Sequence, residues 1–262
     1  MNKFITTLSA AAFALASLSA TADTISVGGV TWDSVDNDGG LTASFNFQQW
    51  FSTSLPGFGS EGQFTLADDL AVPVGAGALA GLGEFYNFSN GRGPTAVFDP
   101  NFCTSCELTF AFGGLLPTPP NGGEIAFDTT NSWLNIYFDE TPDFANFTNL
   151  PDTAHSEFVE AQNGTLWASF VFDSFVLDGS ILGGFVEAEL SVVGGLADVV
   201  EALNFHDDIA DIAFTSSAIF GNDELYSDEG NGQISNNIPE PTTLAILGLG
   251  LLGLAGARRK QS

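Results

Sequence analysis

Short stretches in which every second residue is apolar recur along most of this chain. Residues 41–48 read Leu-Thr-Ala-Ser-Phe-Asn-Phe-Gln, and the same alternation appears at 107–112, 134–139 and 186–192. The stretch 166–177 is apolar on both faces in its first half, which is typical of a central strand. Successive side chains of a β-strand point to opposite faces of its sheet, so this period of two residues predicts half-buried strands.

Turn-forming residues separate these strands. An example is 33–40, Asp-Ser-Val-Asp-Asn-Asp-Gly-Gly, where Asp and Asn side chains accept turn hydrogen bonds and Gly permits a positive φ. Helical patterns are confined to 196–203 and 153–162, and strands do not alternate with helices. We therefore predict a single all-β domain over residues 23–220, built as an antiparallel β-sandwich or jelly roll.

The first 22 residues have the three parts of a secretory signal peptide. Lys3 gives the start a positive charge, an apolar run covers about residues 8–18, and Ala20 and Ala22 are the small residues that signal peptidase requires. The chain is therefore predicted to be exported and cleaved by signal peptidase, which leaves Asp23 as the new N-terminus.

An uncharged apolar run, residues 242–257, lies near the other end of the chain, and Arg258, Arg259 and Lys260 follow it. Basic residues stay on the cytoplasmic side of a membrane, so the run is predicted to be a transmembrane segment with residues 23–238 outside. At about 1.5 Å per helical residue the run covers only about 24 Å of a ~30 Å hydrocarbon core.

The tripeptide Pro239-Glu240-Pro241 comes just before the apolar run and is rigid, because proline fixes φ and lacks an N–H group. The tripeptide, the short run and the basic residues together resemble the PEP-CTERM sorting signal, which would cover 238–262. The resemblance implies that an exosortase, a membrane-embedded cysteine protease, cleaves the chain near the tripeptide. It also implies a Gram-negative host that sends the protein to its surface or extracellular matrix, with exopolysaccharide as a partner. A permanent single-span anchor is the alternative.

The exported region is strongly acidic. The chain has 32 Asp and Glu residues against 5 Lys and Arg, and only Arg92 among the basic residues lies between the two terminal signals. This charge repels nucleic acids and anionic lipid headgroups, so we expect neither as a partner, and membrane contact only through the C-terminal tail. Most carboxylates must be solvated, screened by salt or bound to divalent ions. The acidic, polar stretch 221–237 is predicted to be a linker that gives the exosortase access.

Cys103 and Cys106 are the only cysteines. A redox pair of this spacing starts a helix, whereas here a strand follows, and a zinc site would need His155 and His206 as further ligands. In an exported protein the two cysteines are therefore predicted to form a structural disulfide, which stabilises so short a loop by about 2 kcal/mol.

Asp36 and Asp38, in the sequence Asp-Asn-Asp-Gly, contain part of a calcium-binding loop pattern, although the spacing of an EF-hand fails. They are the candidate Ca²⁺ ligands from the sequence, with an ordinary turn as the alternative. We expect no other cofactor.

The sequence contains no recognisable catalytic set. No Gly-x-Ser-x-Gly motif accompanies the histidines, and carboxylate pairs such as 139–140 are too frequent in so acidic a chain to indicate a hydrolase. We therefore expect a structural surface or matrix protein and not an enzyme. Two alternatives stay open: a carbohydrate- or calcium-dependent binding module that uses Trp50, Trp133 or Tyr137, and a secreted glycoside hydrolase.

Overall fold

The computed structural model of the protein describes residues 24–33, 41–52, 66–67, 72–73, 77–89, 98–99, 102–103, 105–119, 121, 124–144, 157–180, 182–204, 210–217, 219–220, 227 and 230–236. The signal peptide with Ala20 and Ala22, the candidate calcium ligands Asp36 and Asp38, and the sorting segment 238–262 lie outside these residues. Within the described residues, no helix has the length and apolar character needed to span a membrane. The transmembrane segment at 242–257 is not among them and stays a prediction.

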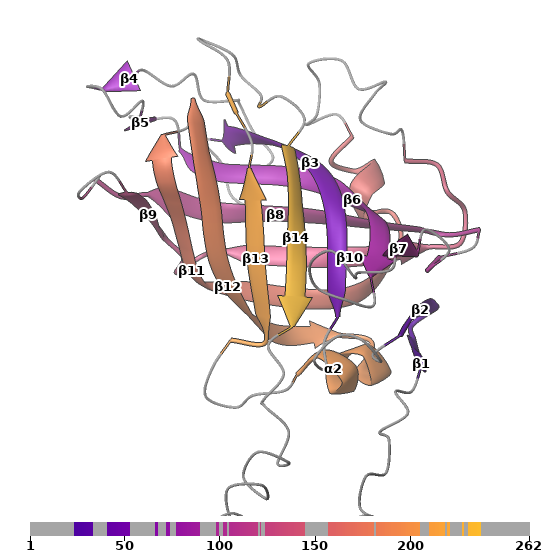
Figure 1. Ribbon diagram of the computed structural model, residues 1–262. Helices are drawn as coiled ribbons and strands as arrows, with labels where there is room; N and C mark the ends of the chain where they lie inside the picture. Colours follow the sequence, from indigo (N-terminus) through magenta and orange to yellow (C-terminus); the bar gives the residue numbers. More distant parts are fainter. Residues whose placement is uncertain are drawn as a thin grey trace, which may run out of the picture.

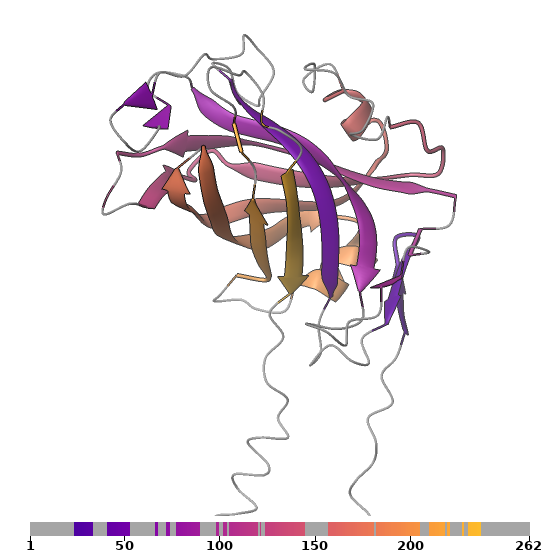
Figure 2. The ribbon, with the colours of Figure 1, turned by 45° about the horizontal axis from the view of Figure 1, so that its top comes forward.

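Eight antiparallel strands form a closed barrel (Figures 1 and 2). Around the barrel they follow the order β3 (Thr42–Ser52), β6 (Ala78–Ser89), β8 (Glu107–Pro117), β10 (Trp133–Asp139), β11 (Thr165–Ser180), β12 (Gly183–Gly195), β13 (Ile212–Ser217) and β14 (Gly230–Asn236). The circle closes because β14 pairs with β3, from Gly230 opposite Phe47 to Ser235 opposite Thr42. The prediction of an all-β antiparallel fold is confirmed.

These strands do not separate into the two packed sheets of the predicted sandwich or jelly roll. β6 pairs with both β3 and β8, and β10 pairs with both β8 and β11, so one sheet continues around the barrel. Alternation of apolar and polar residues is the same in a sandwich and in a barrel, because each has one buried face. Closure depends on pairings between strands far apart in the sequence, which the alternation does not encode.

The remaining elements are short. The described strands outside the barrel are β1 (Thr24–Val27), β2 (Val30–Asp33), β4 (Leu66–Ala67), β5 (Val72–Pro73), β7 (Phe98–Asp99) and β9 (Glu124–Asp128). The helical pattern at 196–203 is confirmed as α2 (Ala197–Leu203), whereas the described part of 153–162 contains a 3₁₀ helix at Glu160–Gln162. Both α2 and the β1–β2 hairpin lie at the end of the barrel where β14 finishes (Figure 1).

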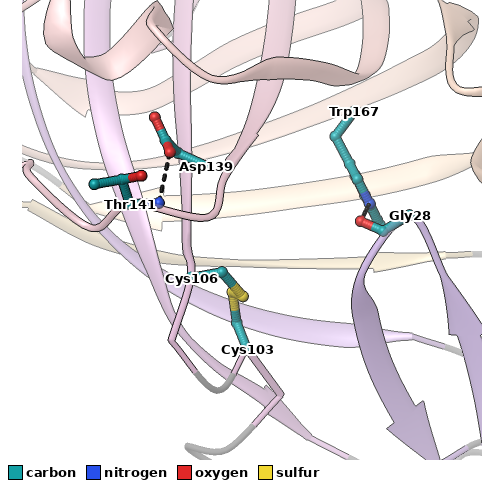
Figure 3. The surroundings of a disulfide bond; sticks show 6 residues. All are labelled: Gly28, Cys103, Cys106, Asp139, Thr141 and Trp167. Carbon is teal, nitrogen blue, oxygen red and sulfur yellow. Dashed lines mark hydrogen bonds between the residues drawn. A yellow bond between two sulfur atoms is a disulfide. The ribbon is translucent and has the colours of Figure 1, made fainter.

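The β1–β2 hairpin is fastened to the barrel through its turn. Gly28 and Gly29 have φ values of +53° and +83°, which side chains other than glycine rarely adopt. The indole N–H of Trp167 donates to the carbonyl of Gly28 at 3.1 Å (Figure 3), and a Cβ on Gly28 would overlap that indole. Beyond the turn, Val30 and Trp32 are buried in the main core.

Phenylalanine rings fill the inside of the barrel. The ring centroid of Phe45 lies 5.1 Å from those of Phe110 and Phe214. An eight-stranded barrel is just wide enough for side chains to fill it. A glycine on the wall makes room for one of these rings, since a Cβ on Gly232 would overlap Phe45. The central cavity has a volume of about 10 Å³, far below the roughly 300–1,000 Å³ of a small-molecule site.

β14 occupies residues 230–236 of the stretch 221–237 that composition assigned to a linker. Its sequence, Gly-Asn-Gly-Gln-Ile-Ser-Asn, contains one large apolar residue, Ile234, which is buried in the main core. Glycine and asparagine are typical of turns, and for that reason the composition indicated a linker. The structure corrects this boundary, because the barrel continues to Asn236. Position 232 requires glycine, since a Cβ there would overlap the ring of Phe45.

Candidate functional site

The candidate site lies on the outer face of the barrel. Leu108, Phe110 and Phe112 of β8 point into the main core, so the alternate residues of that strand point outward. On this outer face a second apolar cluster, named here the outer cluster, is covered by the chain's own residues. Its members are Trp50, Ala80, Leu82, Ala111, Phe144, Phe158 and Ala161, with Trp133 packed against them.

Two of the three aromatic residues proposed for sugar binding, Trp50 and Trp133, pack in this outer cluster. Phe158 lies between Trp50 and Trp133, with ring centroids 5.5 Å and 6.1 Å away. Trp50 is 1% exposed and Trp133 is half-buried. The hydroxyl of Tyr137 donates to Gln162 Oε1 at 3.3 Å, in the segment that covers the cluster. These three residues therefore do not form an open aromatic face, which weakens the carbohydrate-binding alternative.

Glu107, Asp139 and Asp143 form an acidic cluster next to the outer cluster. Glu107 begins β8 and Asp139 ends β10, and the two residues lie directly opposite each other in the antiparallel pair. One carboxylate oxygen from each of the three residues lies within 4.8 Å of the other two. Like charges placed opposite each other on neighbouring strands repel, so this arrangement is unfavourable unless something compensates it.

The turn after β10 carries Asp143 to Glu107. The N–H of Thr141 donates to Asp139 Oδ1 at 2.7 Å (Figure 3), which tightens the start of the turn. The N–H groups of Asp143 and Phe144 donate to Glu107 Oε2 at 3.2 Å and 3.0 Å. Because the side chain of Phe144 is buried in the outer cluster, packing holds the turn in this position.

A disulfide between Cys103 and Cys106 leads directly into Glu107, and the predicted pairing is confirmed. Their Cα atoms are 5.3 Å apart, and Asp139 and Thr141 belong to the surroundings of this bond (Figure 3). The disulfide thus fixes the turn from which β8 starts, at the acidic cluster. His155 and His206 lie outside the described residues.

Two carboxyl groups of this region, those of Glu107 and Glu84, are poorly solvated. Burial raises the pKa of Glu107, the N–H of Phe144 opposes this shift, and the negative charges of Asp143 and Asp139 add to it. Burial raises the pKa of Glu84, on β6, from an ordinary value of 4.5 to about 7, and repulsion from Glu107 contributes. None of the described residues is Lys, Arg or His, so no side-chain cation in that part of the chain offsets these charges.

The free energy of unfolding is expected to depend on pH through Glu84. Its pKa is raised in the fold, so protonation of Glu84 favours the folded state. This contribution to the free energy of unfolding is fully present below pH 4.5 and is lost as the pH rises through about 7. In EDTA, unfolding of the unchanged protein should become easier by up to roughly 3 kcal/mol between pH 4.5 and pH 8. The variant Glu84→Gln should show a flatter profile and higher stability at pH 8 in urea unfolding. A profile that Glu84→Gln leaves unchanged would contradict this assignment.

The acidic cluster is not recognisable in the sequence, because its members come from a strand start, a strand end and a turn. The available signal was Glu107, which follows Cys106 and stands at a polar position of an alternating strand. The candidate ligands Asp36 and Asp38 lie outside the described residues, so calcium binding by them stays a prediction.

Comparison with known proteins identifies the other functional region. Residues 237–260 match the PEP-CTERM protein-sorting motif, which confirms the resemblance carried by Pro239-Glu240-Pro241 and Arg258-Arg259-Lys260. No curated protein and no solved structure matches the chain. The matched segment begins one residue after β14 ends at Asn236. The motif implies export, sorting to the cell surface by an exosortase, and processing and anchoring at the cell envelope. The chain is therefore a protein that carries a PEP-CTERM sorting motif at its C-terminus.

Proposed function

We propose that the barrel is a structural component of the surface or exopolysaccharide matrix of a Gram-negative bacterium, and that it is not an enzyme. The sorting motif at residues 237–260 is the observation that carries this proposal, because it addresses the protein to the envelope. The filled interior supports it, since the cavity that the described strands of the barrel enclose, about 10 Å³, is too small for a substrate. The exported region, with Arg92 as its one basic residue, is charged enough to stay dispersed in a hydrated matrix.

A calcium-dependent binding module is the second candidate, and the acidic cluster of Glu107, Asp139 and Asp143 favours it.

A glycoside hydrolase would use two carboxyl groups, one with a raised pKa, as Glu84 has beside Glu107. Glu107 is only 5% exposed, which makes it a poor partner for a sugar. Hydrolysis of a polysaccharide by the purified protein, lost in Glu84→Gln, would overturn the structural proposal.

The sorting step is tested by replacing Pro239, Glu240 and Pro241 with Ala, Gln and Ala. We expect the variant to accumulate uncleaved in the inner membrane, with at least a tenfold loss from the surface and matrix fractions. A matched control, Pro119→Ala with Glu124→Gln, also removes a proline and a carboxylate, both from exposed positions of the barrel domain. The control should be sorted normally. Normal sorting of the tripeptide variant would refute the proposal.

A further inference from the structure

We propose that Glu107, Asp139 and Asp143 bind a calcium ion on the outer face of the barrel. The site differs from the loop with Asp36 and Asp38 that the sequence pointed to. Two oxygens that each lie about 2.4 Å from one Ca²⁺ are at most about 4.8 Å apart. The three carboxylate oxygens of the acidic cluster lie within 4.8 Å of one another. An ion at their centre is therefore at most about 2.8 Å from each oxygen, and small side-chain shifts would bring all three to the roughly 2.3–2.6 Å of a Ca²⁺–oxygen bond.

An unsatisfied oxygen in the cluster supports the presence of a ligand. Glu107 is 5% exposed, and its Oε2 accepts the two backbone N–H groups of the turn, whereas its Oε1 is buried and has no hydrogen-bond partner. A buried carboxylate oxygen without a partner costs folding free energy, and native proteins rarely leave one unpaired. A bound cation would provide that missing partner.

The charge of the surroundings also requires compensation. Asp139 lies directly opposite Glu107, and Glu84 and Glu160 each interact unfavourably with a member of the cluster. The described part of the chain contains no Lys, Arg or His to balance them. A divalent cation from the medium neutralises such a group without any basic side chain.

The ligand types indicate calcium and not magnesium or zinc. The cluster offers carboxylate oxygens, with neither thiolate nor imidazole, and zinc favours sulfur and nitrogen. Asp143 is exposed, so water is able to complete the six to eight oxygen ligands that Ca²⁺ takes in flexible geometry. Mg²⁺ demands a near-ideal octahedron and loses its own water reluctantly.

The bound ion would fasten the covering segment to the barrel. Asp143 is held by Asn163 Nδ2, which donates to its Oδ1 at 3.0 Å, just after the 3₁₀ helix. A bond from the ion to Asp143 therefore ties the turn after β10 and the end of that helix to β8. These segments carry Phe144 and Phe158, which cover Trp50 in the outer cluster.

The test uses the exported protein purified from its host, stripped of metal with EDTA and then titrated with CaCl₂ by calorimetry. We expect a dissociation constant on the order of 0.1–1 mM, the range of extracellular calcium modules, and at least tenfold weaker binding of Mg²⁺. Asp143→Asn should weaken calcium binding at least tenfold, and because this residue is exposed the variant should fold. Glu187→Gln, which removes an exposed carboxylate from β12, is the matched control and should bind as the unchanged protein does.

Thermal unfolding of Glu107→Gln provides an independent test, because the substitution should affect the melting temperature differently in EDTA and in CaCl₂. In EDTA the variant should melt at or above the temperature of the unchanged protein, because one repelling charge is gone. With 10 mM CaCl₂ the unchanged protein should gain several degrees, whereas Glu107→Gln should gain none. The proposal is overturned if the unchanged protein binds no calcium up to 10 mM, or if Asp143→Asn and Glu107→Gln keep its affinity and its thermal shift.

Discussion

Replacing Phe45 with alanine is expected to lower the free energy of unfolding by about 3–5 kcal/mol. Phe45 has no exposed surface, and its ring lies edge-on or stacked against Phe110 and Phe214. Loss of this ring removes buried apolar area and leaves a void inside the barrel. Hydrogen bonds to β6 and β14 hold β3 in place on both sides, so the wall has little freedom to collapse into that void.

Phe185→Ala is the matched control for this prediction. Phe185 lies on β12 and is 46% exposed, so the same substitution should cost less than about 1 kcal/mol. Urea unfolding followed by tryptophan fluorescence measures both variants. Equal losses in the two variants would mean that the interior is not packed as described.

Removing β14 is expected to abolish cooperative unfolding, whereas removing everything after it is expected to leave the barrel intact. A variant that starts at Asp23 and ends at Asn236 keeps the pairings of β14 with both β13 and β3. A variant that ends at Glu229 loses both pairings, which leaves β13 and β3 as edges and uncovers the ring of Phe45. An opened barrel also exposes unpaired backbone groups, which favour aggregation.

Near-UV circular dichroism and a thermal scan distinguish these two variants. We expect the variant ending at Asn236 to show a near-UV signal and one sharp transition, and the variant ending at Glu229 to show neither. If the shorter variant unfolds like the longer one, residues 230–236 are dispensable and the linker interpretation from the sequence was right.

The strands were predictable where one face is apolar. The alternation at 107–112 and at 134–139 falls within β8 and β10, because each strand has one face toward the main core. β14 was missed because Gly232 stands where the ring of Phe45 needs space, so one large apolar residue, Ile234, marks the buried face of this strand. Closure of the barrel was missed as a consequence, because it depends on the pairing of β14 with β3.

The site was less predictable than the fold. The disulfide followed from the two cysteines alone, and the sorting motif is contiguous in the sequence. The acidic cluster depends instead on the register that puts Asp139 opposite Glu107 and on backbone N–H groups that place Asp143. Neither property is visible in composition or spacing. The burial of Trp50 was not visible in the sequence either, because the residue that covers it, Phe158, lies more than a hundred positions away in the chain.

The intact mass of the protein recovered from the surface and matrix of its host tests the central claim most directly, because barrel and sorting motif meet within one residue at Asn236. We predict a species that starts at Asp23 and ends near Pro239-Glu240-Pro241, with β14 complete and the apolar run 242–257 removed. Recovery of a chain that still carries residues 242–262 and stays embedded in the inner membrane would contradict the account.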